Sequence, residues 1–275
     1  MRRGRRGRRE RKVWRKMTIP LAVVLAVVLL VSCGKLVART TALQSGALVK
    51  WANVQTTVGS SISFSSVTDG PGTWTKFTAV GPSPGSSGTD RAERVADRSE
   101  RVGDHSPPTE YSWDMLISTP ITLLNTESWM ILTQWHQDYR SCPPNVALRI
   151  SKPVAEPQPI LELILRGGIL NKKTCKAQYS YTAKLKDVKV GETTHIDARF
   201  IWSTDRKVAV SVVCVDGEDR ASLINVPNLY EGMQAYMKQG IYRSRSPTRD
   251  VVLMSPVEVT RQPEYLRRNE AVGSC

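Results

Sequence analysis

Gln134 and His136 have the side-chain types and the spacing needed to act together on an acidic group. They lie two residues apart in the segment 133–137, which reads Thr-Gln-Trp-His-Gln. In a β-strand, residues two apart project from the same face. A neutral amide can donate to a carboxylate, and an imidazole can accept or deliver a proton. The segment therefore indicates a site for an anionic ligand, with a polar, solvent-facing strand as the alternative.

A second segment, residues 236–243, carries two phenols and a lysine with the same alternation. Tyr236, Lys238, Gly240 and Tyr242 would share one face, and the residues between them would point toward the core. Gly240 has no side chain and could let a ligand approach the backbone closely. An edge strand with exposed tyrosine and lysine side chains is the alternative interpretation.

A third segment, residues 91–101, contains two Arg-x-Glu-Arg units. In one unit Arg91 would pair with Glu93, and in the other Arg98 with Glu100, each pair lying on one strand face. A carboxylate that orients an arginine in this way leaves part of the guanidinium fork for an anion. A charged surface loop is the alternative.

Taken together, the three segments resemble the signature segments of the jelly-roll polysaccharide lyases, among them the alginate lyases and the heparin-lyase-like and glucuronan lyases. The family motifs RxExR, QIH and YxKAGxYxQ are similar to RAER, QWH and YMKQGIYR here, over roughly residues 50–262. The chain departs from these motifs at Trp135, at Gln239 and in the Arg-Ser pair that follows Tyr242. These differences leave the polymer open among alginate, glucuronan and glycosaminoglycan-like polysaccharides.

The resemblance implies an enzyme, a polysaccharide lyase that cleaves a uronic-acid polysaccharide by β-elimination. Gln134, Arg91 and His136 would hold the carboxylate that acidifies the C5 proton, and Tyr242 would transfer a proton to the leaving oxygen. The base would be Tyr242 in a syn elimination and His136 in an anti elimination. The catalytic candidates are Tyr242, His136, Gln134 and Arg91. The substrate-binding candidates are Lys238, Glu93, Arg98, Tyr236 and Arg243, with Arg98 also the alternative to Arg91.

This scheme requires no metal and no cofactor. A hydrolase would need two carboxylates flanking the scissile bond, and no strand has closely alternating acidic residues of the ExDxE type. The main alternative to the lyase is a non-catalytic carbohydrate-binding or structural surface protein with the same fold.

Short alternating segments separated by turn signals predict the elements that would position these side chains. The chain should be all-β, a concanavalin A-like β-sandwich or jelly roll, with at most a short helix near residues 228–235. On the strand that holds Gln134, we expect Trp129, Ile131 and Trp135 to face the core together. The expected strands are 60–66, 111–118, 128–136, 145–151, 160–166, 195–202, 207–215, 236–243 and 251–260.

The N-terminal residues predict export. Nine of the fourteen net positive charges fall within residues 1–16, ahead of the apolar run 21–31, which is the layout of a secretory signal or membrane anchor. Cys33 ends a lipobox-like sequence and could be lipidated, which predicts a cell-surface lipoprotein or membrane-anchored protein, with secretion as the alternative. Because the basic residues precede an export signal, we expect no nucleic-acid partner.

The predicted organisation has four parts. They are a leader over 1–33, a tether over 34–49, a jelly-roll domain over 50–265 and a flexible tail over 266–275. Export permits disulfides, and Cys142 and Cys175, which flank an expected strand pair, could be bridged or could be free thiols. No CxxC pair or Cys/His cluster has zinc spacing, which argues against a metal site.

Overall fold

The computed structural model describes residues 46–66, 73–81, 88–121, 123, 125–139, 142–262 and 275. The predicted leader with its candidate lipidation site Cys33 lies outside these residues, as do most of the predicted tether and most of the predicted tail. Within the described part of the chain, no helix is long and apolar enough to cross a membrane.

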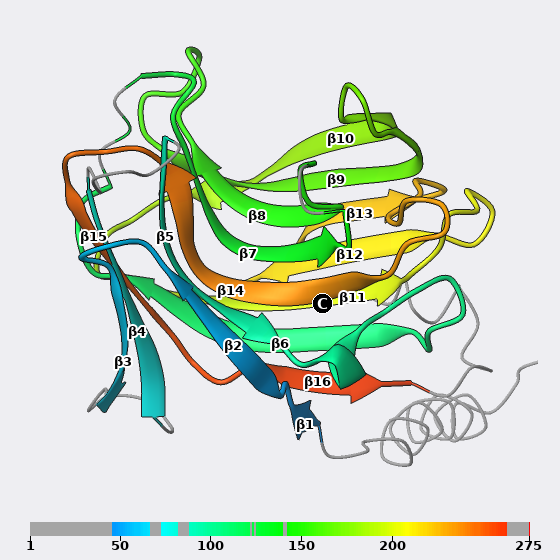
Figure 1. Ribbon diagram of the computed structural model, residues 1–275, viewed down its shortest axis with the longest axis horizontal. Coiled ribbons are helices and arrows are strands. Elements are labelled where there is room, and N and C mark those ends of the chain that lie inside the picture. The colour runs from blue at the N-terminus through cyan, green and yellow to red at the C-terminus, as the bar shows by residue number, and fades with distance from the viewer. Residues whose placement is uncertain are drawn as a thin grey trace, which may run out of the picture. The chain divides into compact units, whose positions relative to one another are not determined.

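The described residues form two antiparallel sheets that pack face to face (Figure 1). The larger sheet has the order β13-β12-β11-β6-β15-β4-β3, with β16 pairing β6 and β1 pairing β16. Its strands are β1 (Ala47–Leu48), β3 (Ser61–Ser66), β4 (Thr73–Val80), β6 (Thr109–Ile117), β11 (Thr193–Ile201), β12 (Val210–Val215), β13 (Glu218–Ile224), β15 (Arg249–Met254) and β16 (Glu258–Arg261).

The smaller sheet has the order β10-β9-β8-β7-β14-β5-β2. Its strands are β2 (Trp51–Thr56), β5 (Thr89–Ala96), β7 (Trp129–Gln137), β8 (Val146–Ser151), β9 (Ile160–Asn171), β10 (Lys176–Asp187) and β14 (Ala235–Ser244). Figure 1 shows β14 and β7 curving side by side through this sheet. The all-β sandwich predicted from the alternation is therefore confirmed.

The core lies between the two sheets and follows the period-two pattern. On β6, Tyr111, Trp113 and Met115 are buried, and the residues between them are partly exposed. Trp135 of the smaller sheet packs against Phe200 of the larger one, with ring centroids 4.9 Å apart. Such edge-to-face pairs bury large aromatic surfaces and fix how the sheets stack.

Residues 228–235, where at most a short helix was expected, form no helix; they are a connection that leads into β14, and its turn includes Gly232 at a positive φ of 67°. The single strand expected over 251–260 is divided into β15 and β16, and Pro256, which has no N–H to donate, lies in the break. The only helical element among the described residues is a single 3-10 turn, η1 (Arg98–Glu100).

Two disulfides are present in the described residues. Cys142 and Cys175 are bonded, which is the first of the two alternatives left open by the sequence. Cys214 of β12 is bonded to Cys275, a pairing that was not predicted from the sequence. Of the predicted tail over 266–275, only Cys275 is among the described residues, and this bond joins it to the larger sheet.

Candidate active site

A cleft of about 460 Å³ lies on the face of the smaller sheet that points away from the core. Its walls and floor come from β2, β5, β7, β8, β9 and β14, together with the connection that carries Cys142. The lining residues are Gln55, Arg91, Trp129, Ile131, Gln134, His136, Cys142, Pro143, Pro144, Ala147, Arg149, Ile164, Arg166, Tyr236, Lys238 and Tyr242.

A β-bulge in β7 decides which of its side chains reach the cleft. The pairing of β7 with β8 shifts between Ile131 and Thr133, so side-chain parity changes there. Trp129 and Ile131 consequently line the cleft together with Gln134, while Trp135 lies in the core. The expectation that all three apolar residues share the core face was therefore wrong for Trp129 and Ile131.

Gln134 lies at the centre of the cleft floor. In register it is flanked by Lys238 of β14 and Ala147 of β8. Its amide nitrogen donates to Glu93 Oε1 on β5 at 2.5 Å. An amide nitrogen carries two hydrogens, so this bond leaves a second one for an anionic ligand.

Glu93 is buried and pairs with Arg91, as the sequence predicts. Arg91 Nε lies 3.2 Å from Glu93 Oε2, and Arg91 Nη1 donates to Gln55 Oε1 at 2.9 Å. Burial raises the pKa of Glu93, against the opposing charges of Lys238 and Arg91 and the bond from Gln134. The carboxyl group therefore orients a cation and an amide at one point of the cleft.

Tyr242 lies between a cation and an aromatic ring. The Arg91 guanidinium carbon is 4.2 Å from the centroid of the Tyr242 ring, and the Trp129 ring packs edge-on with centroids 5.0 Å apart. In register, Tyr242 is opposite Arg91 on one side and Ile131 on the other. These contacts place the phenol beside the arginine that Glu93 holds.

His136 and Tyr236 face each other across β7 and β14, with ring centroids 6.0 Å apart. The Nδ1 atom of His136 is 2.8 Å from the carbonyl oxygen of Gln137. If Nδ1 carries the proton and donates it there, Nε2 holds the lone pair that a base requires. Lys238 Nζ donates to Gln55 Oε1 at 3.2 Å and lies 5.8 Å from the Tyr236 ring centroid.

Three substrate-binding candidates do not line the cleft: Glu93, which is buried and contacts the lining residues Arg91 and Gln134, and the two arginines Arg98 and Arg243. Arg98 is exposed in η1, where the second Arg-x-Glu-Arg unit forms a 3-10 turn and not a strand, so Arg91 is the arginine at the site. Arg243 is buried, and its guanidinium contacts Asp90 and Asp250. It has the core-facing parity of Ile241, and a buried cation needs such partners.

Gly240 was expected to let a ligand approach the backbone, but its missing side chain has another role. Its φ is +138°, and a Cβ atom there would overlap the carbonyl oxygen of Ala92 on β5. The absent side chain therefore lets β14 approach β5 closely and does not open a gap for a ligand.

Cleft residues on three further strands were not predicted from the sequence. Gln55 lies on β2, Arg149 on β8 and Arg166 on β9. Arg149 and Arg166 each interrupt an apolar strand, a signal that could have drawn attention to them. The register that brings them to the cleft is not visible in the sequence.

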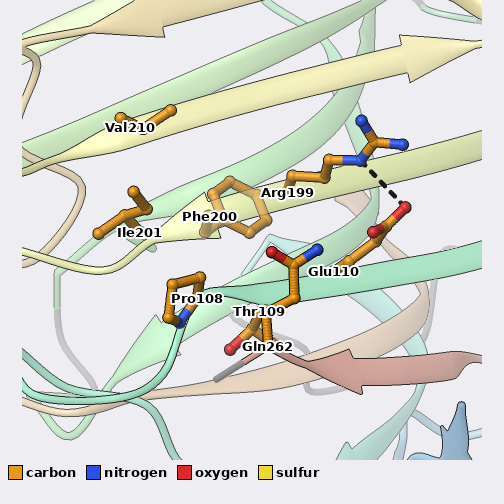
Figure 2. A pocket seen from close by; sticks show the side chains of 8 residues that line it. All are labelled: Pro108, Thr109, Glu110, Arg199, Phe200, Ile201, Val210 and Gln262. Atoms are coloured by element: carbon orange, nitrogen blue, oxygen red, sulfur yellow. Dashed lines mark hydrogen bonds and ion pairs between the residues drawn. The ribbon is translucent and has the colours of Figure 1, made fainter. Parts of the chain in front are cut away.

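A second hollow, on the larger sheet, is much smaller (Figure 2). Figure 2 shows Glu110 of β6 and Arg199 of β11 paired across this face, with Arg199 Nε 3.0 Å from Glu110 Oε1. Its volume of about 10 Å³ is on the order of one water molecule. This hollow cannot hold a sugar ring. No group of His, Cys, Asp and Glu suited to a metal occurs in the described residues.

The described residues form a two-sheet β-sandwich of the jelly-roll type, with one large polar cleft on the smaller sheet. Residues 43–258 match the model of the family described as Polysaccharide lyase, and the chain belongs to this family. The resemblance stated from the three motifs is thus confirmed, and the protein is a lyase. The comparison with curated proteins finds no match.

Solved structures share the fold. An endo-β-1,4-glucuronan lyase from the fungus Trichoderma reesei is 17% identical with a TM-score of 0.63, over 79% of this chain and 93% of that one. The alginate lyase AlyC3 in complex with dimannuronate is 11% identical with a TM-score of 0.51, over 69% and 75%. A mutant of the alginate lyase Aly36B in complex with alginate trisaccharide is 8% identical with a TM-score of 0.51, over 78% and 100%.

Proposed function

We propose that the protein cleaves a uronic-acid polysaccharide by β-elimination in the cleft of the smaller sheet. One observation carries the proposal: Gln134, Glu93, Arg91 and Tyr242 form an unbroken series of contacts along the cleft. The series joins donors for a carboxylate to a group that can transfer a proton.

The chemistry needs both functions at once. The base removes the C5 proton, the electron pair forms the C4–C5 double bond, and the C4–O4 bond breaks as O4 takes up a proton. The C5 proton is acidic only when the adjacent carboxylate is neutralised. Gln134 and Arg91 supply donors for that carboxylate, and Lys238 adds a positive charge beside Gln134.

Tyr242 and His136 flank the position of Gln134 along the strands. Tyr242 is opposite Ile131, three residues before Gln134 on β7, and His136 lies two residues after it. A uronate whose carboxylate is bound at Gln134 could therefore be reached from either side. We assign the transfer of a proton to O4 to Tyr242. The base is Tyr242 if the elimination is syn and His136 if it is anti.

The structural relatives support an acidic polymer as substrate. One is named as a glucuronan lyase, and two are named as alginate lyases in complex with alginate oligosaccharides. The basic leader and apolar run support export to the cell surface, by lipidation of Cys33 or a membrane anchor, with secretion as the alternative.

The test is incubation of the purified protein with alginate, glucuronan, heparin and hyaluronan. We expect at least one polymer to yield products with the ultraviolet absorbance of the new double bond, and we expect chelators to leave the rate unchanged. Binding of a polymer without any such product would favour the non-catalytic carbohydrate-binding alternative.

A further inference from the structure

The arrangement of Arg91 and Glu93 recurs on the other side of the cleft. Arg149 of β8 places Nε and Nη2 each 2.7 Å from Oε1 of Glu162 on β9. The side chain of Arg149 is 29% exposed over a glutamate that is 5% exposed. For Arg91 and Glu93 the corresponding values are 29% and 2%. In both places a buried carboxylate holds an arginine whose remaining N–H groups can bind an anion.

Arg149 lies in register with the catalytic candidates. It is opposite Ile131, which is opposite Tyr242, which is opposite Arg91. Neighbouring strands are about 4.8 Å apart, a spacing comparable with the length of one sugar unit in a chain that crosses the strands. Because β8 is adjacent to β7, Arg149 is placed to reach the sugar next to the one held at Gln134.

The floor between these cations is apolar. Ile131, Ala147 and Ile164 form a buried cluster outside the main core, with Trp129 and Tyr242 packed against it. Ala147 and Ile164 continue the row of Gln134 across β8 and β9. An apolar surface of this kind suits the C–H face of a pyranose ring, whose polar groups then point sideways toward charged residues.

A second cation borders this floor. Arg166 of β9 lines the cleft, and its Nη1 donates to the carbonyl oxygen of Pro144 at 3.2 Å. Ala147 and Ile164 are opposite each other on antiparallel strands. Arg149 follows Ala147 by two residues on β8, and Arg166 follows Ile164 by two residues on β9, so the two arginines lie in opposite directions along the cleft. The floor formed by Ala147 and Ile164 is thus bounded by an arginine on each side.

We propose that this part of the cleft is a second uronate subsite. Arg149, positioned by Glu162, binds the carboxylate of a sugar whose ring lies on Ala147 and Ile164, and Arg166 supplies a further positive charge. The inference rests on the proposed function of the same cleft. It implies that the protein recognises consecutive uronates, as in a homopolymer, in preference to a chain in which uronates alternate with neutral sugars.

The test uses Arg149→Ala, with Arg199→Ala as its matched control. Arg199 is similarly half-buried and pairs with a glutamate, but it lies on the larger sheet, away from the cleft. The probes are saturated hexamers of glucuronic and mannuronic acid. Because the subsite binds ground state and transition state alike, we expect Arg149→Ala to raise KM about tenfold and to change kcat by less than about twofold. Arg199→Ala should change neither constant.

Removal of Arg149 leaves the buried Glu162 without its arginine, so the variant's circular dichroism is compared with that of the parent protein. Arg149→Gln retains a donor to Glu162 while removing the charge, and it tests the subsite if Arg149→Ala does not fold. Equal KM values for the Arg149 and Arg199 variants would overturn the subsite.

Binding of the same hexamers, measured by calorimetry in a Tyr242→Phe background, separates the two proposals. Absence of unsaturated product from the wild type would refute the proposed function alone. Hexamer binding that Arg149→Ala weakens about tenfold would still support the subsite, and unchanged binding would refute it.

Discussion

At the scale of single residues, Glu93 determines how the candidate active site is arranged. It is buried, accepts a bond from Gln134, pairs with Arg91 and lies near enough to Lys238 for the charge of that lysine to oppose the rise in its pKa. A buried carboxylate is costly unless it is paired, and here its partners are the groups that would meet the substrate. The contacts that offset the cost of burying the Glu93 carboxylate are therefore the same contacts that position Gln134 and Arg91 in the cleft.

Tyr242→Phe tests the proton transfer assigned to this residue. The substitution retains the ring that packs against Trp129 and Arg91 and removes only the hydroxyl. We expect kcat to fall by about 10²–10⁴-fold with little change in KM or in the melting temperature. Lyase activity within about threefold of the wild type would contradict the assignment.

At the scale of elements, side-chain alternation predicted which residues of one strand share a face, and the family resemblance brought the strands together. Alternation paired Gln134 with His136 and Lys238 with Tyr242, the resemblance joined the two pairs in one site, and the structure places all four in the cleft. Trp129 was misplaced because the bulge in β7 depends on how two strands pair. Parity beyond the bulge cannot be read from a strand considered alone.

Pairs that join different strands were also beyond the sequence. Arg243 was proposed for substrate binding, but its partners Asp90 and Asp250 lie on two other strands, β5 and β15. Arg149 went unnoticed for the same reason, since Glu162 is thirteen residues away and is brought to it only by the β8–β9 register. By contrast, Arg91 and Glu93 were found because both partners lie on one strand face.

A histidine on the larger sheet pairs with two aspartates, so we expect its contribution to stability to depend on pH. His195 Nδ1 lies 2.7 Å from Asp114, and its Nε2 lies 3.3 Å from Asp197. Burial lowers the pKa of His195, but the bond and charge of Asp114 and the charge of Asp197 outweigh it, so the pKa is raised. The resulting stabilisation is present at pH values below the unfolded pKa and is lost as the pH rises through the folded pKa.

His195→Gln should therefore reduce stability more at pH 5.5 than at pH 8.5. Because the side chain is 44% exposed, we expect the difference in melting temperature to be only about 1–2 °C. Thermal unfolding of both proteins across this pH range measures it. Equal losses at both pH values would show that the histidine contributes packing without charge. Lyase activity should be unaffected, because His195 does not line the cleft.

At the scale of the whole molecule, the two disulfides serve different parts of the sandwich. Cys142 lines the cleft beside Pro143 and Pro144, and its bond to Cys175 anchors that wall to the β9–β10 connection. Cys214 lies on the outer side of the larger sheet, among Val210 and Val212. Its bond to Cys275 closes a longer segment of chain, far from the catalytic candidates in the topology.

This difference predicts separate effects for two double variants. The bonds close loops of 33 and 61 residues, so loss of either should lower the free energy of unfolding by about 4 kcal/mol when chain entropy alone is considered. Only Cys142→Ser with Cys175→Ser should also raise KM, by about tenfold, because it releases the cleft wall.

Cys214→Ser with Cys275→Ser is the control, since it removes a crosslink without touching the cleft. Denaturant unfolding and steady-state kinetics measure the two effects, and equal KM values in the two variants would show that the Cys142 bond contributes stability without shaping the cleft.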